Sequence, residues 1–521
     1  MKKLFCLILF CSVGFSQTTP HRRIKPRENV MTARAAARFL DQATWGPTPA
    51  SIVSLQQTGI SEWLAAQFSA TPSDLPDQPI LDSDGNSNNN LTPIQQAFYA
   101  NAVNGPDQLR QRVAFILSQI WVVSEVSVHP AYAFPPYWRI FRDNAFGNYR
   151  DIIQAVTLSP AMGTYLNMAN NNKANASKGT AANENYAREL MQLFTLGLTE
   201  LNPNGTPVLD ANKNPIPTYN QAVVTNMAKV MTGWTYPTAP GAAAKANNPA
   251  YYFGQMFAVD AEHDTTAKTI FNNITVPAGQ TAEQDLNTVL DALMQQPTMA
   301  PFISQQLIQH MVTSNPSPAY VERVAQVFSS TQGDMKSVIT AILTDPEARA
   351  GDDASAPVNA SFGHLREPAL FMANLVRGLN GTLTTTNSLN AYANEMGEDL
   401  FDAASVFSYF SPQYRTEGGL LGPEFQIYST QTATDRANVV TVALYGSLDQ
   451  TTKLNLAPFV AKAGNMSELL DYISYIFLHS AMSSNLTKAA TEAANAATTP
   501  TAKAEAALYV VLTSSEYQVI Q

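Results

Sequence analysis

The chain has 521 residues, of which 45% are hydrophobic and only 14% charged, and this apolar content excludes a chain that is disordered along its length. Its formal net charge is -10, so its surface repels the phosphate backbone of nucleic acids and we expect no nucleic-acid partner. Since the chain has only six histidines, a metal site built from several imidazoles would use most of them.

The first sixteen residues have the pattern of an export signal. Lys2 and Lys3 form a basic start, and residues 4–13 are an apolar run that is too short to span a bilayer. Gly14 and Ser16 place small residues where signal peptidase reads them, so we predict cleavage after Ser16 and a periplasmic or secreted protein. A buried N-terminal helix is the alternative. Both cysteines lie in this segment, which predicts a mature chain without disulfides.

The mature chain reads as helical from its start. Residues 17–31 are polar and basic and predict a flexible leader. Thr32 is a typical N-cap for the Ala-rich helix that follows it. Pro106 opens a helix to about Ser124 with apolar residues on one face, and another helix is expected near 148–158. No later stretch is long and apolar enough to cross a membrane.

The middle of the chain mixes helices with less regular segments. A helix is predicted from Asn183 to Gly197, a turn or small hairpin at 201–218, and a helix from about 220 to 232 that ends at Gly233. Residues 235–280 have the least helical pattern, and we expect one or two short strands there.

Helices return with the capping box of Thr281 and Gln284 and continue to the C-terminus, broken at 381–388 and 411–423. The fold class predicted from these elements is mainly α, a multi-helix globular bundle with a few short strands or hairpins in its middle. We expect one large helical domain over residues 32–521, with a candidate sub-boundary near residue 281.

The first candidate site is the helix start at 183–189. Asn185 and Glu189 are four residues apart and share a helix face, and Glu184 and Arg188 have the spacing of an ion pair. Glu184 and Glu189 are five apart and point in different directions, so they do not form a carboxylate dyad. The alternative is structural: Asn183 caps the helix and Glu184 interacts with the positive end of its dipole.

The second candidate is the loop with Asp260, Glu262, His263 and Asp264. Four ionisable groups within five residues can bind a cation or orient a general base, and an imidazole beside carboxylates suits a transition metal. The alternative is a solvated acidic loop in which His263 hydrogen-bonds a neighbour.

For three other features, a structural role is the simplest interpretation. His310 lies among apolar residues of a helix and is predicted to be a packed, hydrogen-bonded histidine. His364 precedes a helix start, where capping is a sufficient role. The aromatic and glycine-rich segment 407–425 has two interpretations, a shelf that stacks sugars or a loop packed on the core.

Several long motifs resemble the bacterial family called domain of unknown function 1800. They are Arg38–Thr48 (RFLDQATWGPT), Asn183–Gly197 (NENYARELMQLFTLG), Thr232-Gly233-Trp234, His263-Asp264 and Leu365-Arg366-Glu367-Pro368. The resemblance implies an exported, mostly helical bacterial protein, encoded beside a second exported family that is similar to sulfatases and alkaline phosphatases. It implies no established activity. Many members carry a His-rich stretch where this chain has Ser118–Ser124, which contains no histidine.

The leading hypothesis is an exported enzyme that hydrolyses or modifies an extracellular polymer. The helix start at 184–189 and the loop at 263–264 would form its site. His263 would be the general base, or a ligand of a divalent metal ion together with Asp264, and Glu184 or Glu189 would be the partner carboxylate. This hypothesis requires Glu189 and His263 to converge on an open pocket.

The same site would bind substrate through Asn185 and Arg188, with Arg188 holding an anionic group. The competing hypothesis is a non-catalytic binding or assembly protein of the cell envelope. It would act with the exported sulfatase-like or phosphatase-like partner, and its polar motif would be a buried network that fixes helix packing.

Overall fold

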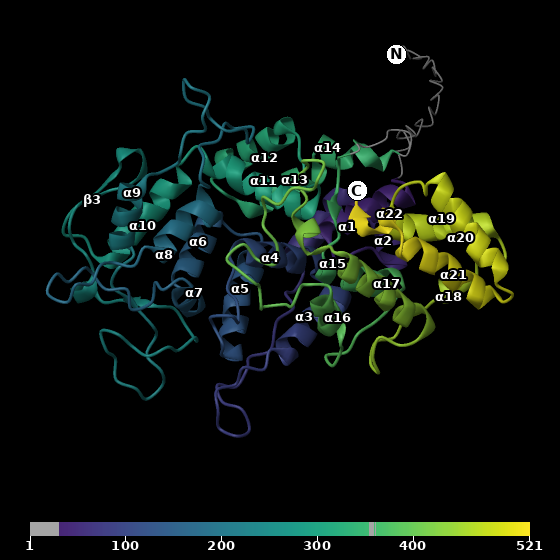
Figure 1. Ribbon diagram of the computed structural model, residues 1–521, viewed down its shortest axis with the longest axis horizontal. Helices are drawn as coiled ribbons and strands as arrows, with labels where there is room; N and C mark the ends of the chain where they lie inside the picture. Colours follow the sequence, from purple (N-terminus) through teal and green to yellow (C-terminus); the bar gives the residue numbers. More distant parts are fainter. Residues whose placement is uncertain (1–30, 354–358, 360) are drawn as a thin grey trace, which may run out of the picture.

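The computed structural model describes residues 31–353, 359 and 361–521, and it confirms the predicted mainly α fold (Figure 1). These residues form 22 α-helices, and their named strands pair as three antiparallel sheets of two strands each. No helix in the described part is both long enough and apolar enough to cross a bilayer. The predicted cleavage after Ser16, and nearly all of the predicted leader, lie outside the described residues.

The first five helices lie in the middle of the view in Figure 1. They are α1 (Ala33–Ala43), α2 (Pro49–Ser69), α3 (Thr92–Asn104), α4 (Gln108–Ile120) and α5 (Phe134–Asn144). The predicted N-cap is confirmed, because the Thr32 hydroxyl accepts a hydrogen bond from the Ala35 amide at 3.1 Å. Helix α4 ends earlier than predicted, because Trp121 leaves helical geometry with a ψ of 72°.

One end of the molecule, teal and blue in Figure 1, contains both predicted site segments. Its elements are α6 (Tyr149–Thr157), α7 (Pro160–Tyr165), α8 (Asn185–Glu189), α9 (Gln221–Val230), α10 (Ala282–Met294), β1 (Trp234–Thr235), β2 (Phe257–Ala258), β3 (Lys268–Thr269) and β4 (Thr275–Val276). Strands do occur in the region 235–280, but as two short antiparallel pairs, β1–β2 and β3–β4. The capping box of Thr281 and Gln284 at the start of α10 is confirmed.

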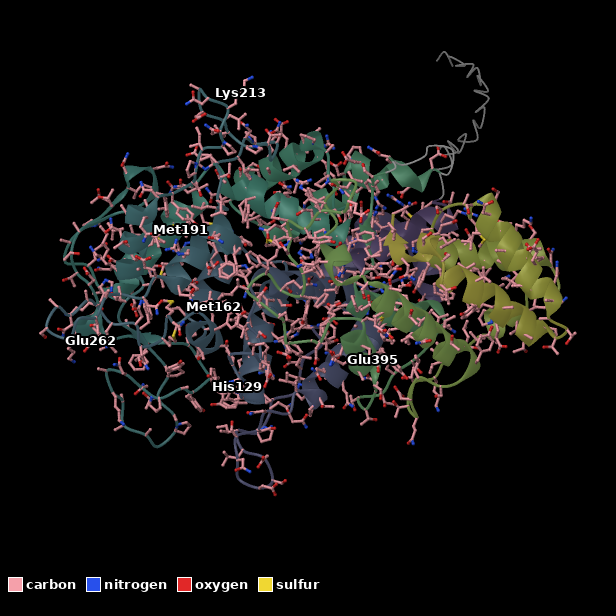
Figure 2. The ribbon with its side chains drawn as sticks, in the orientation of Figure 1. His129, Met162, Met191, Lys213, Glu262 and Glu395 are labelled. Carbon is pink, nitrogen blue, oxygen red and sulfur yellow. The ribbon has the colours of Figure 1, made fainter. Side chains whose placement is uncertain are left out.

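Two irregular features of this end agree with the sequence. The segment 201–218 forms a hairpin with bridges at Thr199–Pro217 and Leu209–Pro215, and Figure 2 shows Lys213 at its tip. The helix predicted from Asn183 begins at Asn185 as α8 and continues as the π-helix η2 (Leu190–Thr195). Single π-helical turns often occur at functional sites.

Gly233 is required where the chain turns from α9 toward β1. Its φ is +86°, and a Cβ at this position would lie 2.9 Å from the Cβ of His263. We therefore expect Gly233→Ala to lower the free energy of unfolding by about 1–3 kcal/mol, measured by chemical denaturation. Gly241→Ala is the matched control, because Gly241 has a φ of +79° but no atom near its added Cβ. An equal loss in both variants would show that contact with His263 contributes nothing.

The next elements continue through the middle of the molecule. They are α11 (Met299–Met311), α12 (Pro318–Ser330), α13 (Met335–Thr344), α14 (Pro346–Arg349), β5 (His364–Leu365), α15 (Pro368–Gly378) and α16 (Leu389–Glu395). All eleven residues of α15 are buried, as expected for a helix that is apolar on nearly every face. The residues just before α15 are therefore carried into the interior with it.

The last elements, green to yellow in Figure 1, form the opposite end and return the chain to the middle. They are α17 (Thr430–Tyr445), α18 (Ala457–Val460), α19 (Met466–Ile473), α20 (Ser484–Ala496), α21 (Pro500–Leu512), α22 (Ser515–Gln518) and β6 (Val519–Ile520). Strand β6 pairs with β5, with His364 opposite Ile520. One cluster of buried apolar side chains extends from Ala36 to Ile520. The sub-boundary near residue 281 stays a prediction.

Candidate functional site

The helix start at 183–189 exposes an ion pair, as its spacing predicts. Arg188 Nη2 donates to Glu184 Oε2 at 3.0 Å, and the Gln221 amide and the Thr225 hydroxyl, both on α9, also donate to Glu184. The Gln221 hydrogen bonds, followed by those of Thr225 and Arg188, lower the pKa of Glu184. Glu184 is therefore an ionised carboxylate whose oxygens already have partners.

Glu189 differs from Glu184 in its surroundings. It is half-buried, its Oε2 has no hydrogen-bond partner, and burial raises its pKa despite the nearby Arg188. Asn183 bonds locally, because its Oδ1 accepts from the amide of Asn185 at 2.9 Å, and α8 begins at Asn185 rather than at Asn183. Neither Asn185 nor Arg188 contacts the loop that holds His263 through any hydrogen bond recorded among the described residues.

His263 lies in a buried network rather than on an open surface. Its Nδ1 is 2.9 Å from the carbonyl oxygen of Thr232, and its Nε2 is 3.1 Å from Asp285 Oδ2. Lys268 Nζ donates to the same Asp285 oxygen at 2.6 Å. The side chains of His263, Lys268 and Asp285 are fully buried. The contacts of His263 are thus those of a residue that holds α10 to the segment after α9.

Asp264 lies next to the same network, because its amide donates to the Thr232 hydroxyl at 2.9 Å and Lys268 Nζ is 3.9 Å from its Oδ1. Its Oδ1 accepts hydrogen bonds from the backbone amide and the hydroxyl of Thr266. Burial acts to raise the pKa of Asp264, but these hydrogen bonds act in the opposite direction and the pKa is lowered. Among residues 31–353, 359 and 361–521, no three His, Cys, Asp or Glu side chains gather as metal ligands. Within that part of the chain, His263 and Asp264 are therefore not joined by a third residue of these types in an arrangement that could hold a metal ion.

The two predicted segments are linked through a third one, residues 171–173, and not through their acidic and imidazole groups. The side-chain amide of Asn171 donates to the carbonyl oxygens of Asn183 and Met231. The backbone amide of Lys173 donates to the carbonyl oxygen of Glu262. In Figure 2, Glu262 lies at the outer edge of this end, whereas Met191, two residues after Glu189, lies farther inside. The side chains of Glu189 and His263 form neither a hydrogen bond nor an ion pair with each other.

The buried network predicts a stability effect for His263. We expect His263→Ala to lower the free energy of unfolding by about 1–3 kcal/mol, because Asp285 loses one of its two buried partners. Chemical denaturation measures this, and His129→Ala is the control, since the His129 side chain is 62% exposed. Metal analysis of both proteins is the second readout: a bound divalent ion that His263→Ala removes would contradict a purely structural role.

A second location combines polar side chains with an opening. It is a pocket of about 40 Å³, large enough for a few water molecules. Its walls come from the end of α4, from η2, from α11, from the segment 406–412 and from the 3₁₀-helix η6 (Pro423–Ile427). The polar residues among its walls are Gln119, Gln306, Gln309, His310, Ser408 and Glu424. We call this the polar pocket.

Glu424 is the carboxylate of the polar pocket. It is 4% exposed, and its Oε1 lies 3.2 Å from His364 Nδ1, which donates to it. The second carboxylate oxygen of Glu424 and the second ring nitrogen of His364 have no hydrogen-bond partner. A buried carboxylate with one supported oxygen and one unpartnered oxygen is the arrangement of a general base.

A second buried carboxylate lies behind Glu424. Glu367 Oε2 accepts from Gln119 Nε2 at 2.8 Å, and its Oε1 lies 3.3 Å from Arg112 Nη1. Burial raises the pKa of Glu367, the Arg112 charge lowers it, and the nearby Glu424 raises it further. Glu367 therefore orients Gln119, and both of its own oxygens have partners.

His310 supplies an imidazole to the same pocket. It is half-buried on α11, and burial, followed by the charges of Arg112 and His364, lowers its pKa. The ring is therefore neutral at physiological pH and offers one N–H donor and one nitrogen acceptor. Its ring nitrogens have no recorded hydrogen bond to the described residues.

The sequence from residue 38 to residue 519 matches the family described as protein of unknown function (DUF1800). The chain belongs to this family. The match covers nearly the whole chain, and it includes both the predicted site segments and every wall of the polar pocket. No curated protein and no solved structure matches the sequence.

Sequence reasoning missed this pocket. His310 was expected to be packed and His364 to cap a helix, but His310 lines the pocket, and His364 lies in β5 with its ring on Glu424. One sequence signal was available. Arg366 and Glu367 directly precede a helix that is apolar on nearly every face, and charges carried inside with such a helix need buried partners. Gln119, near the end of α4, is one of those partners.

Proposed function

We propose that the polar pocket is the site of a hydrolase that acts by general acid–base chemistry on a polar bond of an extracellular polymer. The observation that carries the proposal is Glu424, a buried carboxylate with one oxygen held by His364 and the other unpartnered, in the wall of an open pocket that also contains a neutral imidazole. This assignment moves the proposed base from His263 to Glu424, because His263 has its partners in the interior.

Each group of the pocket has a role in this chemistry. Glu424 Oε2 accepts a proton from water as the water oxygen attacks the substrate, and Glu424 returns that proton to the leaving atom. The N–H of neutral His310 donates a hydrogen bond to the substrate oxygen on which negative charge develops. His364 and Gln119 are positioning residues, since they act through Glu424 and the pocket wall.

The location and partner of the protein are part of the same proposal. The export signal at residues 1–16 supports a periplasmic or secreted protein. An exported partner that resembles sulfatases or phosphatases is proposed from the family resemblance alone. Co-purification of the mature chain from its own cell envelope is the direct measurement for both.

A binding or assembly protein without catalysis is the second candidate. It is favoured by the fully buried His263–Asp285–Lys268 network, in which a motif of the family fixes helix packing. The two candidates differ in whether any substrate is turned over.

The test is a search for hydrolysis by the purified mature protein on matched chromogenic amides, esters and glycosides. We expect turnover of one class that disappears in Glu424→Gln and weakens in His310→Gln. Turnover that is equal in all three proteins, or no turnover on any class, would contradict the proposal and leave the binding candidate.

A further inference from the structure

A second cavity of about 30 Å³ adjoins the polar pocket. Most of its wall residues are apolar or aromatic, among them Phe98, Phe134, Trp138, Phe141, Leu400 and Ala403, and the polar ones are Ser118, Gln119 and Ser408. Trp138 Nε1 and Gln119 Oε1 are the buried polar side-chain atoms of its lining that have no hydrogen-bond partner. A cavity of this composition takes up a small apolar group rather than a charged one.

The two cavities have two wall residues in common, Gln119 and Ser408. Gln119 is 6% exposed and is held by Glu367. Ser408 is in the left-handed region with a φ of +69°, and so is Phe401, with a φ of +70°, in the same segment. Non-glycine residues in this conformation cluster at ligand sites, where the surrounding structure holds them. A ligand that extends from one cavity into the other would have to pass these two side chains.

The unpartnered atoms around the polar pocket define the polar end of such a ligand. Glu424 Oε2 and Gln119 Oε1 are acceptors without donors, and Gln306 Nε2 is a donor without an acceptor. The Gln119 amide is oriented by its bond to Glu367, which leaves its oxygen as the free atom. Two acceptors beside one donor complement an amide group, which has an N–H and a carbonyl oxygen. A carboxylate at this position would be repelled by Glu424.

We infer that the two cavities form one bipartite site for an amide that bears a short aliphatic group. The amide lies at Glu424, Gln119 and Gln306, and the aliphatic group enters the aromatic cavity beside Ala403. This inference rests on the proposed function and names its substrate class, an N-acyl or peptide-like bond. Binding by itself needs no catalysis, so the two can be tested separately.

The test measures the affinity of acetamide, propionamide and butyramide for the purified full chain by saturation-transfer NMR titration. We expect the affinity to rise about fourfold for each added methylene, which is the gain for burying one CH₂ group. Acetate, propionate and butyrate are the charge controls, and they should bind at least tenfold more weakly than the matching amides. Equal affinity along the amide series, or equal affinity of amides and carboxylates, would overturn the inference.

Two variants locate the binding. Ala403→Leu fills the aromatic cavity and should remove the dependence on chain length. Ala463→Leu is the matched control, because Ala463 is likewise 4% exposed and outside a helix but lines neither cavity. Val123→Ala enlarges the aromatic cavity, so the affinity of the amides should keep rising as far as pentanamide. This second variant decides the test if the Ala403→Leu protein does not fold. The same chain-length dependence in all variants would contradict the inference.

The outcomes separate this inference from the proposed function. If amide affinity depends on chain length but hydrolysis is unaffected by Glu424→Gln, the inference stands and the proposed function fails. If hydrolysis needs Glu424 but no chain-length dependence appears, the proposed function stands and the bipartite site is wrong.

Discussion

Glu424→Gln is expected to lower the hydrolytic kcat by about 10²–10⁴-fold, the contribution of a positioned general base. The substitution keeps the size of the side chain and its Oε1 acceptor for His364 Nδ1, so the pocket keeps its shape. It removes the unpartnered carboxylate oxygen that would accept the proton from water. Measured rates with the substrate found in the panel check this prediction.

The control for this variant is Glu395→Gln, the same substitution at an exposed residue of α16 (Figure 2). It should leave kcat and KM unchanged. Circular dichroism and the unfolding midpoint of Glu424→Gln should match those of the wild type. A tenfold or smaller loss of kcat in a correctly folded Glu424→Gln protein would exclude Glu424 as the base.

Arg366→Met is expected to lower the free energy of unfolding by about 3–5 kcal/mol, the cost of removing one partner of a buried ion pair. Both terminal nitrogens of Arg366 donate to the Asp41 carboxylate at 2.9 Å, and both side chains are 1% exposed. Asn374 also donates to Asp41, and His479 Nε2 lies 3.0 Å from it. The variant leaves Asp41 buried without its main counter-charge. Urea denaturation at neutral pH measures the loss.

The control is Lys488→Met, which breaks an exposed pair with Glu492. Little change is expected, because both side chains are more than two-thirds exposed and solvent screens their interaction. An equal loss in Arg366→Met and Lys488→Met would contradict the assigned role of the buried pair.

The same pair gives the unfolding free energy a defined pH dependence. Burial raises the pKa of Asp41, but Arg366 and His479 outweigh burial and hold it far below its ordinary value. A carboxyl whose pKa is lowered in the folded state stabilises the fold above its unfolded pKa of about 3.9 and loses this contribution as the pH falls below it. The difference between the wild type and Arg366→Met should therefore shrink between pH 5 and pH 2. A difference that stays constant with pH would contradict the pKa assignment.

The sequence by itself determined the helical class, the caps at Thr32 and Thr281, the hairpin at 201–218 and the pairing of Glu184 with Arg188. Each of these follows from residues within a few positions of one another, where helical spacing, capping and turn chemistry act. The motifs also determined the family. They did not distinguish a functional histidine from a structural one, because His263 has the same local pattern whether its ring faces water or Asp285.

Only the tertiary structure decided where the chemistry can lie. The polar pocket brings together residues from α4, η2, α11 and the segment 406–424, which are separated by up to about 300 positions in the chain. Strand β6 pairs with β5 and closes the chain on the segment that carries His364 and Glu367. Burial and the partners of a charge are long-range properties, set by how the apolar faces of many helices pack, and they fix which carboxylate keeps an unpartnered oxygen.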